Sequence, residues 1–432
     1  MKQLISNWKL SGSSLIYSLM ISLLVSTLLS AYLMADFSYR GLVRRTYAEM
    51  RVQDNLRSAI VLALDEERQL GFEAFSYWHE SDSIGITYEN WGGYKLVHAK
   101  TRHQQSSGSL SALIGQKLPL GARSFVLSDE GYPLVLKGQT RIRGEIAVPQ
   151  AEILTERYNG AAFMGSYPPV GKVKASRRLS QGDFPDIPWQ IKRSLDSLSR
   201  LRLQDPLPYL LEEDIVQSWA GPVRRIQAQG RMIIRGGSYK GKLMLMARES
   251  IEIDAQAAME DVILIAPTIK VGNGVRGRFQ VFASDSLLLG DEVQLQFPSL
   301  LAVSAKPGRP SFLAIKTGCR IEGAVLFYQP IDSTTSSNLR PQVSIGDRST
   351  VYGTLHVAGN LTLNGVVGGM VIAKGFVLRT AVGTVRNHLL NAQLLKDRLA
   401  PAYAGPFLFD KAETEVLQIY QHEKAKMAAH WE

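Results

Sequence analysis

Residues able to do chemistry are sparse in this 432-residue chain, and they do not gather into a recognisable motif. His79 and Glu80 lie near two tryptophans, Trp78 and Trp91, and we interpret this group as core and surface of a small β unit. The single cysteine, Cys319, excludes an internal disulfide framework. Without a CxxC motif or a His/Cys cluster, the sequence argues against a structural zinc site. We therefore expect no metal, no cofactor and no catalytic residue.

One histidine and a set of acids are the remaining candidates for catalysis. His356 could act as a general base, but it falls on an outward position between the inward Leu355 and Val357. No second group is placed to orient it, so we interpret it as an exposed strand residue. Acids on outward positions scatter over different corners of the repeat described next and do not line up along one face. They are Glu252, Asp254, Glu260, Asp261, Asp285, Asp291 and Glu292.

A six-residue spacing of apolar residues dominates the middle of the chain. From 233 to 293 every sixth residue is apolar: Ile233, Tyr239, Leu245, Ile251, Ala257, Ile263, Ile269, Val275, Val281, Leu287 and Val293. A companion set lies two places later: Ala247, Ile253, Met259, Ile265, Val271, Ala283, Leu289 and Leu295. Two inward residues around one outward residue make a short strand, because side chains alternate between faces. Three such strands close a coil of about 18 residues. The pattern predicts a mainly β fold with a triangular parallel β-helix over 223–385.

The same spacing recurs on both sides of this tract. Leu136, Ile142 and Val148 are six apart, and we place the first β-helix coil at 123–154. The G-x-apolar rhythm of 345–378 resembles bactofilins, which are polymer-forming β-helical scaffold proteins. Hexapeptide acyltransferases share this rhythm and use a loop histidine as general base, which would fall to His356. β-Helical polysaccharide lyases need aligned acidic ligands and a basic residue. A carbohydrate-active or acyl-transfer enzyme is thus the less favoured alternative.

The segments that interrupt and follow the repeat are predicted to be partly helical. In 155–222 we expect an insertion with two short helices, in PWQIKRSLDSLSRLRL and PLPYLLEEDIVQSWAG. Its basic residues could bind a polyanion such as nucleic acid or polysaccharide, although a solvated charged face is the simpler interpretation. The candidates are Lys172, Lys174, Arg177, Arg178, Lys192 and Arg193. In 386–432, leucines at helical spacing predict a helix that caps the last coil, followed by a second helix.

The N-terminus carries a segment suited to a membrane. Leu15 to Ala35 contains no charge, and 21 residues of helix span roughly 30 Å, the thickness of a bilayer core. The absence of a clear cleavage site after this stretch favours a retained anchor over a secretory signal. No proline interrupts the following residues up to about Leu70. We predict one long helix over 13–70, after a basic leader at 1–12 and before a small antiparallel β unit at 71–122.

This N-terminus resembles type IV pilins and pseudopilins over about seventy residues. The leader MKQLISNWKLSG carries Lys2 and Lys9 and ends at Gly12, where the resemblance implies cleavage that frees Ser13. The fifth residue after the cut is usually Glu in these families, and here it is Tyr17. Some minor members lack that Glu. The resemblance implies a structural or assembly role in a type IV pilus or type II secretion system.

Charge leaves the orientation in the membrane open. The net charge of +10 favours anionic neighbours such as lipid head groups. Arginines that follow the apolar segment, from Arg40 to Arg51, would place the large domain in the cytoplasm by the positive-inside rule. A pilin-like route would place it in the periplasm, which we favour. We predict a non-enzymatic, single-pass protein of the bacterial inner membrane with protein partners. A membrane-tethered, bactofilin-like polymer is the alternative.

Overall fold

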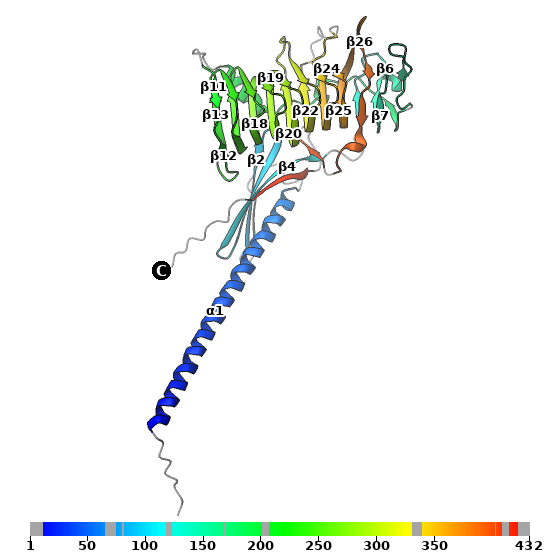
Figure 1. Cartoon of the computed structure of the whole chain (residues 1–432). Helices are drawn as coiled ribbons and strands as arrows, with labels where there is room; N and C mark the ends of the chain where they lie inside the picture. The colour runs from blue at the N-terminus through cyan, green and yellow to red at the C-terminus, as the bar shows by residue number, and fades with distance from the viewer. Residues whose placement is uncertain are drawn as a thin grey trace, which may run out of the picture.

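The protein consists of a long helix, an antiparallel sheet at the end of that helix, and a stack of parallel strands that lies across the sheet (Figure 1). The computed structural model describes residues 12–64, 75–79, 82–117, 123–167, 169–200, 207–330, 339–401, 403–407 and 414–421. Strands dominate over helices, and the parallel sheet closes on itself. The chain is therefore mainly β with one long N-terminal helix.

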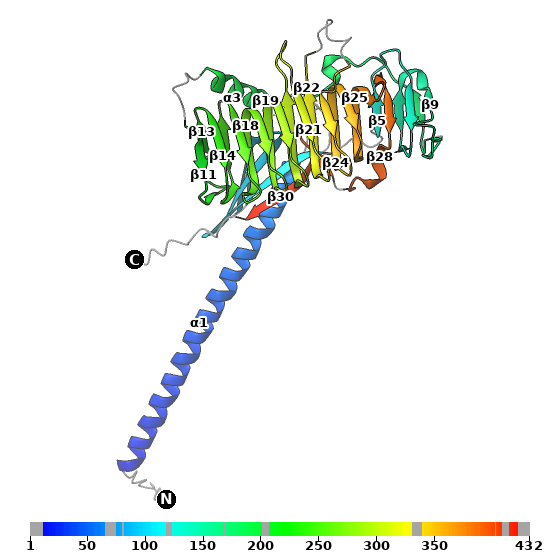
Figure 2. The same cartoon turned by 45° about the horizontal axis from the view of Figure 1, so that its top comes forward.

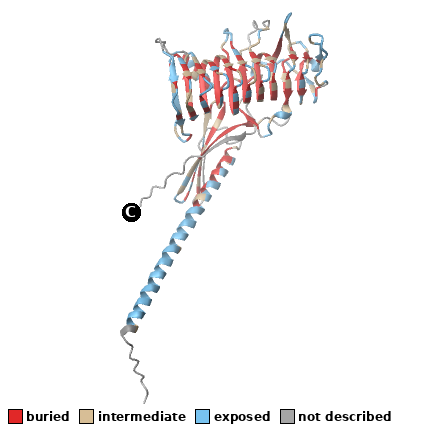
Figure 3. Cartoon of the chain, viewed as in Figure 1, coloured by how far each residue is buried: buried red, intermediate tan, exposed pale blue. Residues whose placement is uncertain are grey.

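Helix α1 (Gly12–Ala63) runs without interruption for 52 residues, or about 78 Å at 1.5 Å per residue. It is long and apolar enough to cross a membrane, as either an anchor or a signal sequence would be. Its side chains are almost all exposed up to Tyr47, and from Ala48 onward one stripe is buried (Figure 3). The buried stripe comprises Ala48, Val52, Leu56, Ala59, Ile60 and Ala63. Residues 65–74, where the sequence predicted the end of the helix, lie outside the described part.

The antiparallel sheet receives this stripe. Its strands are β1 (Phe75–His79), β2 (Asp82–Trp91), β3 (Tyr94–His103) and β4 (Ser106–Lys117), with β29 (Ala404–Gly405) and β30 (Thr414–Gln421) both pairing with β4. Because side chains alternate along a strand, Val97 packs toward α1 while its neighbour Leu96 packs toward the parallel strands. The sheet is thus apolar on both faces and joins the helix to the stack.

The parallel stack contains strands that pair in parallel with strands further along the chain, at an offset of 18 residues for Ile251 with Ile269 and for Ile269 with Leu287, and at a longer offset where a loop leaves the stack, as for Leu313 with Val343. Its successive strands are β11 (Tyr209–Leu211), β12 (Ile215–Gln217), β13 (Arg224–Ala228), β14 (Arg231–Ile234), β15 (Ser238–Gly241), β16 (Leu243–Ala247), β17 (Ser250–Ile253), β18 (Ala258–Val271), β19 (Arg276–Leu289), β20 (Gln294–Ser304), β21 (Phe312–Ile315), β22 (Arg320–Tyr328), β23 (Val343–Ile345), β24 (Thr350–Leu363) and β25 (Val366–Thr380). One column of paired residues runs Ile251, Ile269, Leu287, Leu313, Val343 and Leu361. All six are buried in one continuous core.

Most, but not all, residues of the six-residue pattern point into that core. Ile233 is only half-buried, and Ile263 and Ile265 face outward beneath the antiparallel sheet. For Ile263 and Ile265 the cause is a register shift beside Asp261, whose φ is +62°. One extra residue in a strand moves the residues after it to the other face. Ile233 lies between Met232 and Ile234, which are the inward residues of β14. The uniform phase predicted from the sequence is therefore wrong at these three positions.

The far end of the stack is built from segments that are distant in sequence. β25 pairs with β5 (Phe125–Leu127), while β27 (His388–Leu390) and β28 (Gln393–Leu395) pair with β6 (Leu134–Lys137) and β7 (Arg141–Arg143). β8 (Ile146–Val148) then pairs with β10 (Val173–Ala175), and β6 pairs with β9 (Ile153–Thr155). Figure 2 shows β5 beside β25, with β9 further out at the end of the stack. The segment 123–154 thus lies beyond the C-terminal coils in space, so the prediction that it forms the first coil is wrong. The six-residue spacing identifies which residues point inward, but it does not identify which coils are neighbours.

The predicted C-terminal helical cap is wrong within the described residues. His388–Leu390 and Gln393–Leu395 form strands, and Asn387 and Asn391 both adopt φ of +56°, a left-handed conformation that excludes a continuous helix there. Leu389 and Leu394 are buried in the core of the stack. In the tail, β30 is a strand rather than part of a helix, and residues 422–432 lie outside the described part.

The predicted insertion is also not a separate unit. Its first expected helix is present as α3 (Trp189–Ser199), which lies along the outside of the stack (Figure 2). The second expected helix is wrong, since β11 and β12 occupy that segment and open the stack. There, Leu211 pairs with Ile234 and Ile215 pairs with Tyr239. Pairing with β14 and β15 outweighs the weak helical preference of this sequence.

Candidate functional site

Several buried polar contacts lie at the junction between the antiparallel sheet and the stack. The tight turn between β2 and β3 presses Trp91 against the outer face of the stack, where its exposed fraction is 1%. The indole Nε1 donates to the carbonyl oxygen of Asp261 at 3.2 Å. The ring meets Trp219 edge to face, with centroids 5.4 Å apart. This pair joins the sheet to the first coils of the stack.

A buried amide fixes the same turn from the side of the stack. Gln280 Nε2 donates to the carbonyl oxygen of Trp91 at 3.0 Å, and Gln280 Oε1 accepts from the amide of Gly93 at 2.8 Å. Gly92 has φ of +63°, and a Cβ there would lie 2.1 Å from Gln280 Oε1. The turn therefore needs glycine at this position, both for its backbone conformation and for its closeness to the amide.

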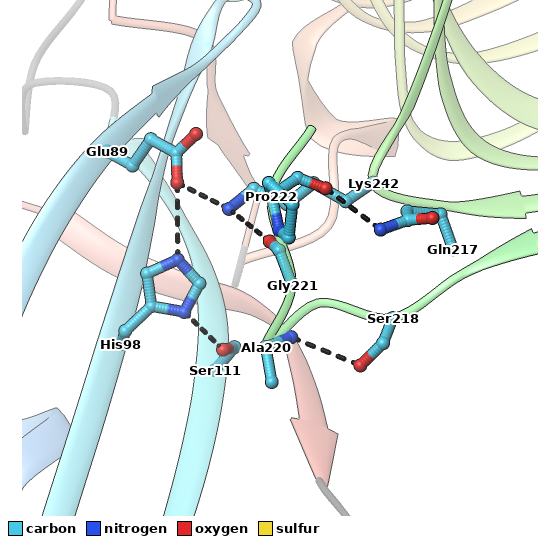
Figure 4. Close-up of polar contacts among 9 residues, drawn as sticks. All are labelled: Glu89, His98, Ser111, Gln217, Ser218, Ala220, Gly221, Pro222 and Lys242. Carbon is cyan, nitrogen blue, oxygen red and sulfur yellow. Dashed lines mark hydrogen bonds and ion pairs between the residues drawn. The ribbon is translucent and has the colours of Figure 1, made fainter. Parts of the chain in front are cut away.

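A second polar cluster flanks the tryptophans at the same junction (Figure 4). Lys242, almost fully buried between β15 and β16, donates to Glu89 Oε2 at 2.6 Å and to the carbonyl oxygen of Gly221 at 3.2 Å. His98 Nε2 lies 3.4 Å from the same Glu89 oxygen, and His98 Nδ1 lies 2.6 Å from Ser111 Oγ. Hydrogen bonds from His98 and Lys242 hold the pKa of Glu89 below its ordinary value. Glu89 therefore remains ionised and joins three strands of the sheet to the stack.

The order Ser111, His98, Glu89 is the order of a nucleophile, a base and an orienting carboxylate. However, Ser111 has no exposed surface, so a substrate cannot reach its hydroxyl in this conformation. Glu89 is also paired with Lys242, which binds the same Oε2 atom that faces the His98 imidazole. The geometry holds two layers together, and the cluster is better described as a structural junction than as a reaction centre.

Removing the buried lysine tests this description. We expect Lys242→Met to lower the free energy of unfolding by about 1–2 kcal/mol, because Glu89 loses its partner but is partly exposed and can be hydrated. A double-mutant cycle with Glu89→Gln should return a coupling energy of about 1 kcal/mol. Lys240→Met is the matched control, since the ion pair of Lys240 with Glu260 is about half exposed on both sides and should change stability by less than about 0.5 kcal/mol. Equal effects of the two methionine variants would contradict the assignment.

A third polar cluster ties α1 to the sheet. Asp82 is buried at the helix–sheet contact, where Arg51 Nε donates to its Oδ2 at 3.0 Å and His103 Nδ1 contacts its Oδ1. Burial raises the pKa of Asp82, but hydrogen bonds from His103, Asn55 and Arg51 together lower it by more, so the net pKa lies below its ordinary value. The carboxylate stays charged and fixes the rotation of α1 on the sheet.

His356 is buried, so the prediction of an exposed strand residue is wrong. Its exposed fraction is 1%, and in the register it lies between Leu326 and Ile372. Leu326 belongs to the apolar cluster that includes the antiparallel sheet, while Ile372 packs with Leu179 and Phe184. This outward face carries a second layer, which the repeat pattern could not reveal. Burial lowers the pKa of His356 to about 3, so the imidazole is neutral at neutral pH.

This burial makes stability depend on pH. The folded pKa of about 3 lies below the value of 6.5 expected in the unfolded chain, so protons bind preferentially to the unfolded state below pH 6.5. The slope approaches about 1.4 kcal/mol per pH unit only below pH 6.5, so wild type should lose about 1.6 kcal/mol through this residue between pH 6.5 and pH 5. In His356→Leu this part of the loss should be absent, as measured by denaturant unfolding at both pH values. An unchanged pH slope in the variant would contradict the burial of a neutral imidazole.

The predicted polyanion-binding residues do not form one patch. Lys174 lies in β10 at the far end of the stack, with Lys172 just before this strand, whereas Lys192 and Arg193 lie on α3. Four of the six contact acids: Lys174 with Glu145, Arg177 with Asp183, Arg178 with Glu130, and Lys192 with Asp186. All six are exposed, so these pairs are surface ion pairs of small energy. The arrangement provides scattered positive charge and no single groove.

Other predicted positions are placed as follows. Gly12 begins α1, the side chain of Ser13 is not described, and the side chains of Trp78, His79 and Glu80 also lie outside the described part. Cys319 is a free, buried thiol that donates to the carbonyl oxygen of Gly290 at 3.1 Å. Within the described ranges, no group of three or more His, Cys, Asp or Glu residues could hold a metal ion.

Sequence reasoning missed the junction residues Glu89, His98 and Lys242. Lys242 follows a strand of the repeat, and the two others lie on strands of the β unit, so each read as an ordinary surface residue. The buried Trp91 was assigned to the core of the β unit alone, and no signal indicated that it contacts Trp219. With this geometry in place, comparison with known proteins adds no further guide: no protein-family model, curated protein or solved structure matches the chain.

Proposed function

We propose that this protein is a non-enzymatic, membrane-anchored structural or assembly component that displays a rigid β-helix. One observation carries the proposal. The exposed apolar part of α1 continues without a break into a buried part that is fixed beneath the antiparallel sheet, and that sheet is fixed onto the stack. A helix joined in this way transmits the position of the membrane segment directly to the stack.

The finer description of the stack as a triangular β-helix is part of this proposal. It is supported by pairing between every third strand from β11 to β17, and by pairing offsets of 18 residues such as Ile251 with Ile269. Each coil would then contribute three short sides around one apolar core. In such a rod each coil contacts the next coil over the whole length of the coil, and these contacts make the rod stiff.

The resemblance of the N-terminus to pilins and pseudopilins guides the choice of setting. We propose a single-pass protein of the bacterial inner membrane, with the stack in the periplasm and with protein partners in a type IV pilus or type II secretion assembly. Support comes from the exposed face of α1 between Ser14 and Tyr47, which is available for packing against other helices in a membrane.

Two measurements test this proposal. N-terminal sequencing of protein recovered from membranes should give Ser13 as the first residue, and an intact Met1 would contradict the pilin-like route. Protease added to spheroplasts should degrade the stack if it is periplasmic. Full protection until the membrane is permeabilised would place the stack in the cytoplasm and overturn the proposed orientation.

A membrane-tethered polymer, similar to bactofilins, is a second candidate function because both ends of the stack expose apolar side chains. At the near end these are Leu207, Tyr209, Leu210 and Val216, and at the far end Leu154, Met164, Tyr167 and Val170. Strands β11 and β9 lie at these two ends, and in the described residues each pairs on only one side. Unpaired strand edges favour association with another chain.

Paired cysteines distinguish this candidate from the first. In a Cys319→Ser background, Val216→Cys and Val170→Cys should form ladders of cross-linked chains only when both are present, if copies join end to end. If only monomers form at the concentration that the protein has in the membrane, the polymer proposal is contradicted and the proposal of an assembly component remains. The cross-link uses the full chain in detergent or lipid, because α1 is part of the packed structure.

A further inference from the structure

The middle of α1 carries an exposed segment between its apolar part and the part that packs on the antiparallel sheet (Figure 3). The uncharged stretch ends at Ala35, and burial against the sheet begins at Ala48. Residues 36–47 between them cover about 18 Å of helix. Every residue from Phe37 to Tyr47 is exposed. A membrane that contains the apolar part would therefore hold this segment at its surface.

Three aromatic side chains mark the depth of that surface. Tyr32, Phe37 and Tyr39 are 68%, 79% and 67% exposed. They lie within about 6 Å of Ala35 along the helix axis. Tyrosine is enriched where the hydrocarbon meets the lipid headgroups, because its ring is apolar and its hydroxyl is polar. Since the headgroup region is about 5–8 Å thick on each side of the hydrocarbon, the residues just beyond Tyr39 reach the lipid phosphates.

The residues at that level are cationic. Arg40, Arg44 and Arg45 are all exposed, and we call them the arginine collar. Along the helix axis they lie about 8, 14 and 15 Å beyond Ala35. Each is therefore inside the headgroup region or within about 8 Å of it, the distance over which charges act at physiological salt. Three arginines and one aspartate give residues 36–47 a net charge of +2.

Contacts within the helix leave much of this charge available. Arg40 pairs with Asp36 at 2.9 Å, and Arg45 pairs with Glu49 at 3.4 Å. Both arginine side chains are more than 60% exposed, so these ion pairs contribute little energy. Arg44 forms no ion pair within the part of the chain that the structure describes. The collar can therefore exchange its weak internal pairs for contacts with an anion.

We propose that the arginine collar binds the phosphate groups of anionic lipids in the leaflet that faces the stack. The planar guanidinium group matches a phosphate in a bidentate manner, and an anionic surface attracts basic residues next to a membrane segment. Such binding would fix the depth of α1, and with it the height of the stack above the membrane. The inference rests on the proposed membrane anchor and applies to either orientation of the stack.

Electron spin resonance on the full chain in phosphatidylcholine vesicles tests this proposal. The readout is the ratio of the association constants of spin-labelled phosphatidylglycerol, which is anionic, and spin-labelled phosphatidylcholine, which has no net charge. We expect wild type to prefer phosphatidylglycerol and added salt to weaken the preference. The ratio should fall by about twofold in Arg44→Gln and by about fivefold when Arg40, Arg44 and Arg45 are all replaced by Gln.

Arg57→Gln is the matched control for these variants. Arg57 is exposed on the same helix but lies about 33 Å beyond Ala35, where the charge of the membrane is screened. The ratio should therefore remain at the wild-type value. Arginine and glutamine have similar helix propensity, so neither the control nor the collar variants should disturb α1. Lys2 and Lys9, which precede the apolar segment, are unchanged in every variant and cancel in the comparison.

Three results would overturn the proposal. The first is an equal association of both lipids with wild type, and the second is an equal loss of preference in Arg57→Gln. The third is an unchanged ratio in the triple variant, which would assign the collar to another partner such as an acidic protein segment. Sodium phosphate should weaken the preference no more than sodium chloride of the same ionic strength. Stronger competition by phosphate would assign the collar to a soluble anion instead of a lipid.

Flotation of the vesicles in a density gradient separates failure of this inference from failure of the proposed function. The triple variant should float with the vesicles as wild type does, because the apolar stretch from Leu15 to Ala35 is unchanged. A wild-type chain that is not recovered with the vesicles would contradict the membrane anchor itself. A chain that floats without a preference for the anionic lipid would contradict the arginine collar alone.

Discussion

Trp91→Ala is expected to lower the free energy of unfolding by about 3–5 kcal/mol, the range for removing a large buried aromatic side chain. The indole is 1% exposed and lies between the antiparallel sheet and the stack. Its loss removes the contact with Trp219 and leaves the carbonyl oxygen of Asp261 without this donor. The sheet would keep its packing on α1, because that contact uses the opposite face. We therefore expect the two parts to unfold in separate transitions in calorimetry of the detergent-solubilised protein.

Trp189→Ala is the matched control for this prediction. Trp189 begins α3 and is 64% exposed, so its removal should change stability by less than about 0.5 kcal/mol. Both variants remove one indole, which cancels any general effect of losing a tryptophan on fluorescence or solubility. A single transition in Trp91→Ala at the wild-type midpoint would show that the turn does not hold the two parts together.

The importance of this junction follows from how the fold is assembled. Within the described residues, α1 contacts the antiparallel sheet through its last four turns, and the sheet contacts the stack through its other face. A force or displacement applied to α1 would reach the stack through contacts that include Trp91, Gln280 and the Glu89–Lys242 pair. The proposed structural function therefore depends more on this small region than on the length of the stack.

The sequence predicted the repeat well where local spacing determines the structure. In the column from Ile251 to Leu361, inward residues alternate with outward ones on every short strand, and this alternation is visible in the chain. The same is true of α1, where length and composition are sufficient to indicate a long helix. These features depend on residues that are close in sequence.

The errors arose where distant contacts decide the outcome. The leucines of 388–395 fit a helical spacing, but strand edges of β6 and β7 were available to pair with them, and Asn387 and Asn391 turn the chain at the corners. His356 looked exposed because nothing in its neighbourhood indicates a covering layer. The register shift at Asp261 depends on one left-handed residue. None of these contacts produces a periodic pattern in the amino-acid sequence.

Gly353→Ala is the second change from which we expect a large loss. Gly323, Gly353 and Gly369 are paired in register on β22, β24 and β25, and the chain backbones approach closely along this column. A Cβ at Gly353 would lie 1.7 Å from the carbonyl oxygen of Gly323, and the φ of Gly353 is +149°. It would also lie 2.8 Å from the hydroxyl of Tyr403, which donates to that same carbonyl at 3.2 Å.

The column thus cannot accept a side chain without moving two strands or the buried Tyr403. Overpacking and backbone strain each cost about 1–3 kcal/mol, so we expect a loss of about 3–5 kcal/mol in the free energy of unfolding. Gly369→Ala separates the two causes, because its Cβ would meet the carbonyl of Gly353 at 1.8 Å without an unusual φ. Gly236→Ala is the control, with no atom within 4 Å of the new Cβ, and it should be neutral or slightly stabilising. If Gly353→Ala and Gly369→Ala both unfold at the wild-type midpoint in thermal scans, the strands cannot be as close as this column requires.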